Sequence, residues 1–226
     1  MAELLSVRFS KIGYRDARLD GLSYSLTLSD GSPENALIIG SNSSGKTSQL
    51  HLLFSIFLPH HNELVSEKDS SGRHFAYYFE ENEIGFVATE WTIPGSGNLP
   101  GMAAAKTRVV GRFSQFTNRE RYEHTTVFFS FIADSERGID DLPLTSSIPH
   151  RVAISPKTVH EAKKYLRELF DDKPSREFYL TEGMSDWQKH LRRIGYNIEQ
   201  FKLMMQFTMS EGDSSSFLKK LVRLYK

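Results

Sequence analysis

Cysteine is absent from this 226-residue chain. Its absence excludes disulfide bonds and metal sites built from thiolates, and it is typical of proteins from a reducing compartment. The N-terminus lacks a basic segment followed by an apolar one, and no apolar run approaches the roughly 18 residues of a membrane-spanning helix. We therefore expect a cytoplasmic protein.

The chain also has no formal net charge, because 28 Lys and Arg residues balance 28 Asp and Glu residues. The chain as a whole then has no attraction to nucleic acid, and any contact with DNA must come from local basic patches. Hydrophobic residues make up 39% of the chain and aromatic residues 12%, which is enough for a real core. The length allows one large domain or two small ones.

The most informative stretch reads Gly-Ser-Asn-Ser-Ser-Gly-Lys-Thr over residues 40–47, which fits the Walker A pattern G-x-x-x-x-G-K-[ST]. An apolar run at 36–39 predicts a buried strand before it, and residues 46–57 carry apolar side chains at helical spacing. A strand, a glycine-rich turn and a helix N-terminus together form an anion site, where backbone N–H groups converge on phosphates. The residues expected to bind the nucleotide are Gly40, Asn42, Ser43, Ser44, Gly45, Lys46 and Thr47.

Two of these residues have roles that their chemistry specifies. Lys46 is expected to reach the β- and γ-phosphates of the nucleotide, and the Thr47 hydroxyl is expected to ligate Mg²⁺. No Asn-Lys-x-Asp guanine motif occurs in the chain, which disfavours a GTPase. ATP and Mg²⁺ are therefore the expected cofactors.

Periodicity predicts the other elements. Strands are expected at 4–12, 22–28, 84–93, 108–113, 125–133 and 151–155, with a turn at 118–123. Ser155 and Pro156 are expected to open a helix, and the chain after Pro174 is expected to be helical. Its helices are placed at 185–194, ended by Gly195, and at 197–205, with a polar break at 207–215 and an amphipathic helix from 217.

With this order of elements, the chain resembles the N-terminal half of the ATPase head of SMC-type proteins, the group that includes SMC, RecN and MukB-like proteins. The resemblance rests on Asn42, Gly45, Lys46 and Thr47, while Ser43 departs from the usual glycine. It implies an α/β P-loop NTPase lobe of the ABC and SMC-head type, with an antiparallel β-rich part and C-terminal helices. Residues 1–215 would form the lobe, and 216–226 would start a coiled coil.

The resemblance also implies further site residues. A glutamine shortly before the coiled coil contacts Mg²⁺ and the attacking water in these heads. Gln206 is the candidate, Gln200 is its rival, and a surface glutamine without a role is the alternative to both. The heads place an arginine near nucleotide and DNA, which here corresponds to Arg15 or Arg18, unless these residues are only a solvated charge cluster.

Two catalytic motifs of the family are absent from the chain. It contains no Leu-Ser-Gly-Gly-Gln signature and no four apolar residues followed by Asp-Glu, the Walker B pair. In the family, both motifs lie after the coiled coil. The resemblance therefore implies a C-terminal half of the same head as a partner, a homodimer that sandwiches ATP, and kleisin-like accessory subunits.

The resemblance predicts an ATPase that acts on DNA in chromosome or plasmid maintenance, repair or defence against foreign DNA. DNA phosphates would contact Lys189, Arg192 and Arg193, together with Lys219, Lys220, Arg223 and Lys226, although a solvated helix surface explains these residues equally well. One alternative is a self-contained RecF-like or ABC-class regulator without a coiled coil. Another is a P-loop interaction module without turnover.

Overall fold

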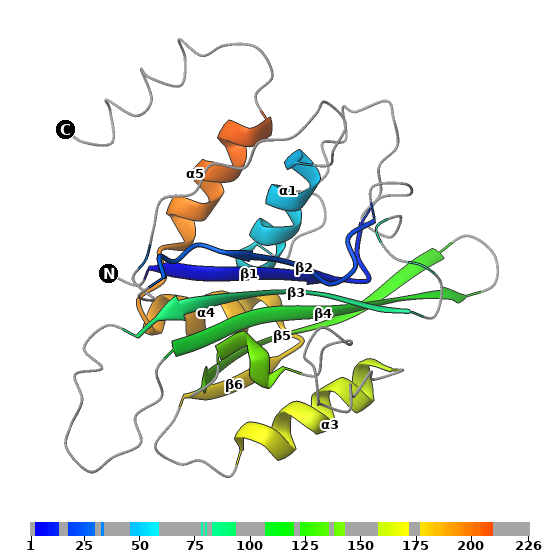
Figure 1. Cartoon of the computed structure of the whole chain (residues 1–226). Helices are drawn as coiled ribbons and strands as arrows, with labels where there is room; N and C mark the ends of the chain where they lie inside the picture. Colours follow the sequence, from blue (N-terminus) through cyan, green and yellow to red (C-terminus); the bar gives the residue numbers. More distant parts are fainter. Residues whose placement is uncertain are drawn as a thin grey trace.

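A computed structural model of the chain describes residues 3–13, 18–29, 33, 46–58, 78, 80, 83–93, 107–119, 123–135, 138–142, 158–171 and 177–209. For residues 46–47, 112–119, 123–129, 141 and 206–209 it describes the backbone alone. Figure 1 shows a sheet between two layers of helices.

The sheet has six strands in the order β2-β1-β3-β4-β5-β6, and every neighbouring pair is antiparallel. Strands β3, β4 and β5 are consecutive in the chain, and β1 lies between β2 and β3. The strands are β1 (Leu4–Ser10), β2 (Leu22–Ser25), β3 (Ile84–Thr92), β4 (Thr107–Arg119), β5 (Glu123–Ser135) and β6 (Phe178–Thr181).

The central strands bury side chains on both faces. Val110 and Ile132 belong to one hydrophobic core, whereas their neighbours Val109 and Phe131 belong to a second core on the opposite face. This alternation follows from the two-residue period of a strand. Both faces of the sheet are therefore apolar, and each requires its own covering layer.

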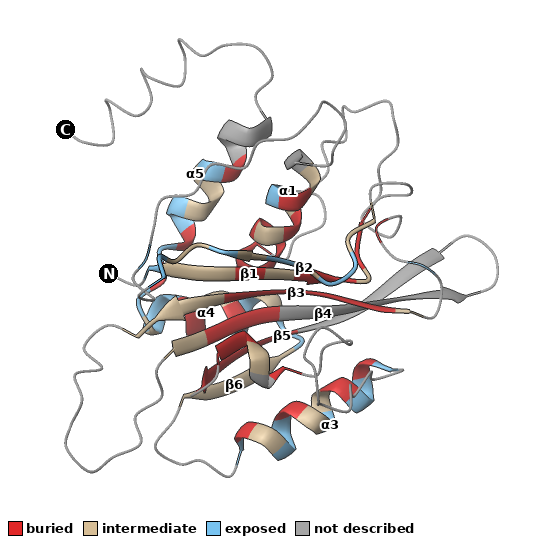
Figure 2. Cartoon of the chain, in the orientation of Figure 1, coloured by how far each residue is buried: buried red, intermediate tan, exposed pale blue. Residues whose placement is uncertain are grey.

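Three helices supply the first core and one supplies the second. Helices α1 (Lys46–Phe57), α4 (Met184–Arg193) and α5 (Ile198–Met209) contribute buried side chains to the core that contains Val110. Helix α3 (Val159–Phe170) and the short 3-10 helix η3 (Gly138–Asp141) cover the other face, on the opposite side of the sheet in Figure 1. Figure 2 shows that α3 is buried along one side and exposed along the other.

The start of α3 differs from the prediction. The helix begins at Val159, and the hydroxyl of Thr158 accepts a hydrogen bond from the backbone N–H of Glu161 at 3.1 Å. This N-cap satisfies a backbone donor that the first turn leaves free, and it lies three residues after Ser155, where the helix was expected to open. The helix packs on the sheet through an apolar face, with Leu169 partly buried and the others buried, namely Val159, Ala162, Leu166 and Phe170.

The prediction that the chain is helical after Pro174 was wrong for residues 178–181, which form strand β6. Phe178 to Thr181 pair with Ala133 to Ser130 on the edge of the sheet. Four residues are too few to show a strand period, so only the pairing with β5 identifies this strand. The helices predicted at 185–194 and 197–205 are confirmed in type, and α5 extends to Met209, into the polar break expected from residue 207.

The bounds of the strands also differ from the prediction, most of all in β2, β4 and β5. Strands β4 and β5 extend into the expected turn at 118–123, because Asn118 pairs with His124 and Arg119 with Glu123. Backbone pairing in a hairpin satisfies N–H and C=O groups whatever the polarity of the side chains. Strand β2 ends at Ser25, before the predicted Leu28. The strands predicted at 36–39 and 151–155 lie outside the described residues, as does the segment 216–226.

One turn has a steric requirement that can be tested. Gly138 has a φ of +62°, and a Cβ atom there would lie 2.0 Å from a carboxylate oxygen of Glu90. That carboxylate accepts hydrogen bonds from the Ser6 hydroxyl at 3.0 Å and from the Ile139 N–H at 3.2 Å. A side chain at position 138 would therefore displace Glu90 as well as strain the backbone.

We predict that Gly138→Ala lowers the free energy of unfolding by about 2 to 3 kcal/mol, from backbone strain plus displacement of Glu90. Gly21→Ala is the matched control, because Gly21 has a φ of +68° with no atom within 4 Å of the added Cβ. The control should cost about 1 kcal/mol, from the strained φ alone. Equal losses for the two variants in urea denaturation would contradict the steric argument.

Candidate functional site

Helix α1 starts at Lys46, directly after the glycine-rich sequence. Residues 40–45 lie outside the described residues, and so do the side chains of Lys46 and Thr47. The first turn of α1 carries no acidic residue, so no carboxylate of its own first turn offsets the partial positive charge of the helix N-terminus. The start of this helix is therefore electrostatically suited to an anion.

Contacts at both ends hold α1 in place. Near its start, the Tyr24 hydroxyl donates a 2.8 Å hydrogen bond to the side-chain oxygen of Gln49. Near its end, the Trp187 indole N–H donates a 2.7 Å hydrogen bond to the Ile56 carbonyl. The Phe57 ring stacks on that of Phe201, with their centroids 4.0 Å apart. The helix start is thus fixed relative to both the sheet and α5.

The two candidate glutamines occupy opposite ends of α5. Gln200 lies in the first turn, where its backbone N–H donates to the Asn197 side chain at 3.1 Å. Gln206 lies six residues later, about 9 Å along the helix axis. The end of α1 meets the first turn of α5, where Phe57 stacks on Phe201. The two helices also run side by side in Figure 1. The end of α5 that carries Gln206 therefore lies on the same side of the molecule as the start of α1.

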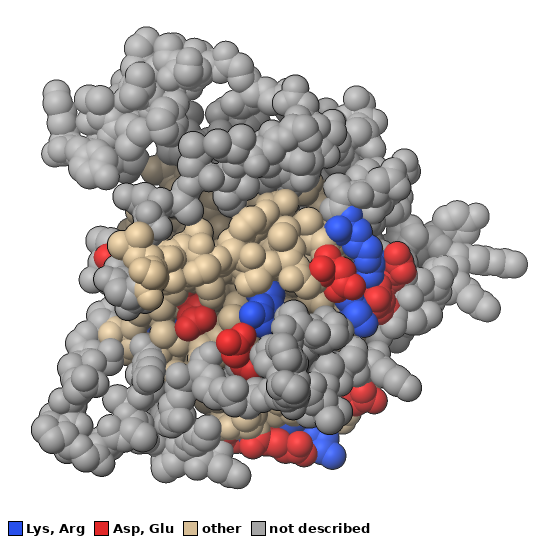
Figure 3. All heavy atoms as spheres, viewed as in Figure 1, with Lys and Arg blue, Asp and Glu red and all other residues tan. Residues whose placement is uncertain are grey.

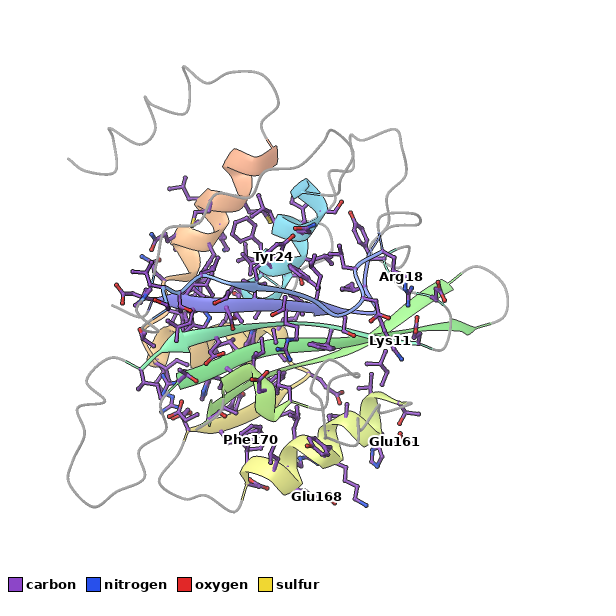
Figure 4. The ribbon with its side chains drawn as sticks, in the orientation of Figure 1. Lys11, Arg18, Tyr24, Glu161, Glu168 and Phe170 are labelled. Carbon is purple, nitrogen blue, oxygen red and sulfur yellow. The ribbon has the colours of Figure 1, made fainter. Side chains whose placement is uncertain are left out.

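Arg18 is described and Arg15 is not. The Arg18 guanidinium forms ion pairs with two carboxylates. Its NH1 group lies 3.2 Å from Glu80 Oε1, and its NH2 group donates to Glu83 Oε2. Figure 4 labels Arg18 near Lys11, whose ammonium group lies 3.7 Å from Glu83. The Arg18 guanidinium, a predicted nucleotide contact, is therefore already paired with two carboxylates.

The basic residues proposed as DNA contacts are likewise paired where they are described. Arg192 lies 3.2 Å from Glu199, and Lys189 lies 3.9 Å from Asp186. Arg193 lies 2.8 Å from a carboxylate oxygen of Glu177. Lys219, Lys220, Arg223 and Lys226 lie outside the described residues. The described part of this surface thus carries balanced charge rather than a basic patch.

A partly buried polar network was missed by the sequence analysis. Arg108 on β4 donates two hydrogen bonds, of 2.6 and 3.1 Å, to the carboxylate of Asp134 on β5. The second oxygen of Asp134 also accepts from the backbone N–H of Glu177 at 3.3 Å. Burial raises the pKa of the nearby Tyr196 hydroxyl, which remains neutral. No motif marks these residues, because strand pairing alone brings them together.

His190 on α4 extends this network. Its ring stacks on Tyr179 with centroids 3.9 Å apart, and its Nε2 lies 3.0 Å from Glu177 Oε1. The guanidinium of Arg193 lies 3.3 Å from His190 Nδ1. A guanidinium can only donate, so Nδ1 accepts and the ring is neutral. Burial lowers the pKa of His190, with Arg193 acting in the same direction and Glu177 opposing them.

In the described segments, no group of three or more His, Asp or Glu side chains is placed to hold a metal ion. Within the same segments, no helix has both the length and the apolar character needed to span a bilayer. The Mg²⁺ contacts predicted for Thr47 and Gln206 involve side chains outside the described set.

Comparison with known proteins adds no family assignment. No family model matches the chain, and no curated protein matches it. The resemblance to SMC-type heads therefore continues to rest on residues 40–47 and on the order of the elements.

The neutral His190 predicts how stability depends on pH. The unfolded chain binds a proton at this residue near the ordinary pKa of about 6.5, whereas the folded protein resists protonation. Stability should therefore fall as the pH drops below that value, and His190→Gln should flatten the decline between about pH 7 and 5.5. Urea denaturation across this range measures the effect. His160→Gln, at an exposed position on α3, should retain the parental slope, and an unchanged slope in His190→Gln would refute the assignment.

Proposed function

We propose that this chain is the ATP-binding part of an SMC-like ATPase, whose ATP-dependent head dimerisation and hydrolysis act on DNA. The observation that carries the proposal is the junction at Lys46, where the Walker A sequence ends and α1 begins. A P-loop needs this arrangement, because the backbone N–H groups of the first helical turn point at the phosphates. The acid-free first turn of α1 favours the same ligand.

The proposed roles follow from the position of each residue in the motif. Backbone N–H groups of residues 40–45 cradle the phosphates, and the Lys46 ammonium neutralises charge on the β- and γ-phosphates. The Thr47 hydroxyl ligates Mg²⁺. Gln206 orients the attacking water beside Mg²⁺. This role is supported because the end of α5 that carries Gln206 lies on the same side of the molecule as the start of α1. Gln200 fits less well, because it lies at the opposite end of α5.

A second half of the head is proposed because α1 and α5 each leave a large apolar side chain exposed. Besides its buried residues, α1 carries Leu50 with 38% of its surface exposed, and α5 carries Met204 with 45% exposed. Large apolar side chains that stay exposed are typical of surfaces that pack against another protein. We infer that the C-terminal half, with the Walker B and signature motifs, packs against these helices.

The first test is the variant Lys46→Ala. It should weaken the binding of Mg²⁺–ATP at least tenfold in calorimetry, because it removes the cation that faces the phosphates. Its thermal unfolding should match that of the parent. Lys164→Ala on α3 is the matched control, since this lysine is exposed and belongs to a different layer. Equal ATP affinity in parent and Lys46→Ala would overturn the P-loop assignment.

The second test concerns the division of the catalytic groups. The isolated chain should bind ATP weakly and hydrolyse almost none, because hydrolysis needs a carboxylate that the Walker B pair supplies. Co-expression with the C-terminal half of the parent protein should bring tight binding, ATP-dependent dimerisation and turnover. Clear turnover by the purified monomer would instead favour a self-contained RecF-like or ABC-class ATPase.

A further inference from the structure

The connection between β1 and β2 is closed at its base by backbone hydrogen bonds. Ile12 and Leu19 form a two-way bridge, with N–H to O distances of 3.2 and 2.8 Å. The Gly13 N–H donates to the carbonyl of Tyr78 at 2.9 Å, which joins this base to the segment that leads into β3. These contacts define what we call the loop base, residues 11–13 and 18–20.

Five charged side chains interact at the loop base, three from the loop base itself and two from the segment before β3. Arg18 pairs with Glu83 through NH2 and with Glu80 through NH1 at 3.2 Å, and Lys11 lies 3.7 Å from Glu83. Asp20 accepts a hydrogen bond of 3.4 Å from the Lys11 backbone N–H. Figure 3 shows positive and negative side chains gathered at the end of the sheet where Figure 4 labels Lys11 and Arg18. The ion pairs thus link the loop base to residues 80 and 83, just before β3.

These carboxylates limit what Arg18 itself can bind. A guanidinium recognises phosphate with its two terminal nitrogens, the groups that Glu80 and Glu83 already engage. The side chain of Glu80 is 71% exposed, but that of Glu83 is only 27% exposed, so the Glu83 pair is better shielded from water. A phosphate would have to displace this shielded carboxylate to reach Arg18.

The loop base is also connected to α1 through the hydrophobic core. Ile12 in the loop base and Phe9 in β1 belong to the same cluster of buried residues as Leu52 and Phe54 of α1. A shift of the loop base would disturb the packing of this cluster, because protein interiors are close-packed. The position of the helix that carries Lys46 therefore depends on the loop base.

We propose that Arg18 is a positioning residue rather than a nucleotide ligand. Through Glu80 and Glu83 it clamps the loop base to the segment before β3, and it affects ATP binding only by holding the loop base and α1 in place. The part of this inference that concerns ATP rests on the proposed function. The clamp itself rests on the contacts of described residues.

Glu83→Gln and Arg18→Ala separate the two roles of Arg18. If Arg18 is a positioning residue, both variants break the same contact, and both should weaken Mg²⁺–ATP binding by about fivefold, the effect of losing one partly shielded ion pair. The double variant should bind no more weakly than either single variant, because the two side chains act as one unit. If Arg18 were a phosphate ligand, Glu83→Gln would release it, and ATP binding would be unchanged or tighter, which would overturn the proposal.

A second measurement does not depend on ATP. Amide hydrogen exchange at Gly13 and Leu19 should accelerate by about fivefold in both variants, because their N–H groups make the bonds that close the loop base. Glu168→Gln, which neutralises an ion pair with Lys164 on α3, is the matched control and should leave both amides unchanged. Unchanged exchange in Arg18→Ala would refute the clamp. If exchange accelerates in both variants but the unmutated parent binds no ATP, the clamp is supported and the proposed function is overturned.

Discussion

The fold depends on the pairing of β3, β4 and β5, whose side chains are buried on both faces of the sheet. Val110 and Ile132 point to one core, and Val109 and Phe131 point to the other. A change of register by one residue would exchange these two sets and move Asp134 and Arg108 to the wrong core. The antiparallel register therefore fixes the positions of both helical layers and of the polar network together.

The two helical layers differ in how completely they are covered. Helix α3 buries one side, with Ala162 and Leu166 fully inside, and exposes charged residues on the other. Helices α1 and α5 each leave one large apolar side chain exposed, Leu50 and Met204 respectively. Exposed apolar side chains of this size are the observation behind the proposal that a partner packs on the α1 and α5 side.

Within the described segments, several arginines are paired with carboxylates. Arg18, Arg108, Arg192 and Arg193 each lie within 3.2 Å of a carboxylate. Pairing of this kind holds elements together but leaves little free positive charge for a ligand. Anion binding is then most favourable where helix geometry supplies the charge, and the start of α1 is such a place.

The sequence alone determined which segments become strands and helices wherever a period had room to repeat, as in β1, β3, α1 and α3. It also predicts a phosphate-binding role for residues 40–47, because the Walker A pattern specifies residue types at fixed spacing. Only the tertiary structure decided that residues 178–181 form β6, since four residues carry no period and pair only through β5. It also decided that Arg108, Asp134 and His190 share one network, and that Glu80 and Glu83 hold Arg18. Such contacts join positions far apart in the chain, and no local pattern encodes them.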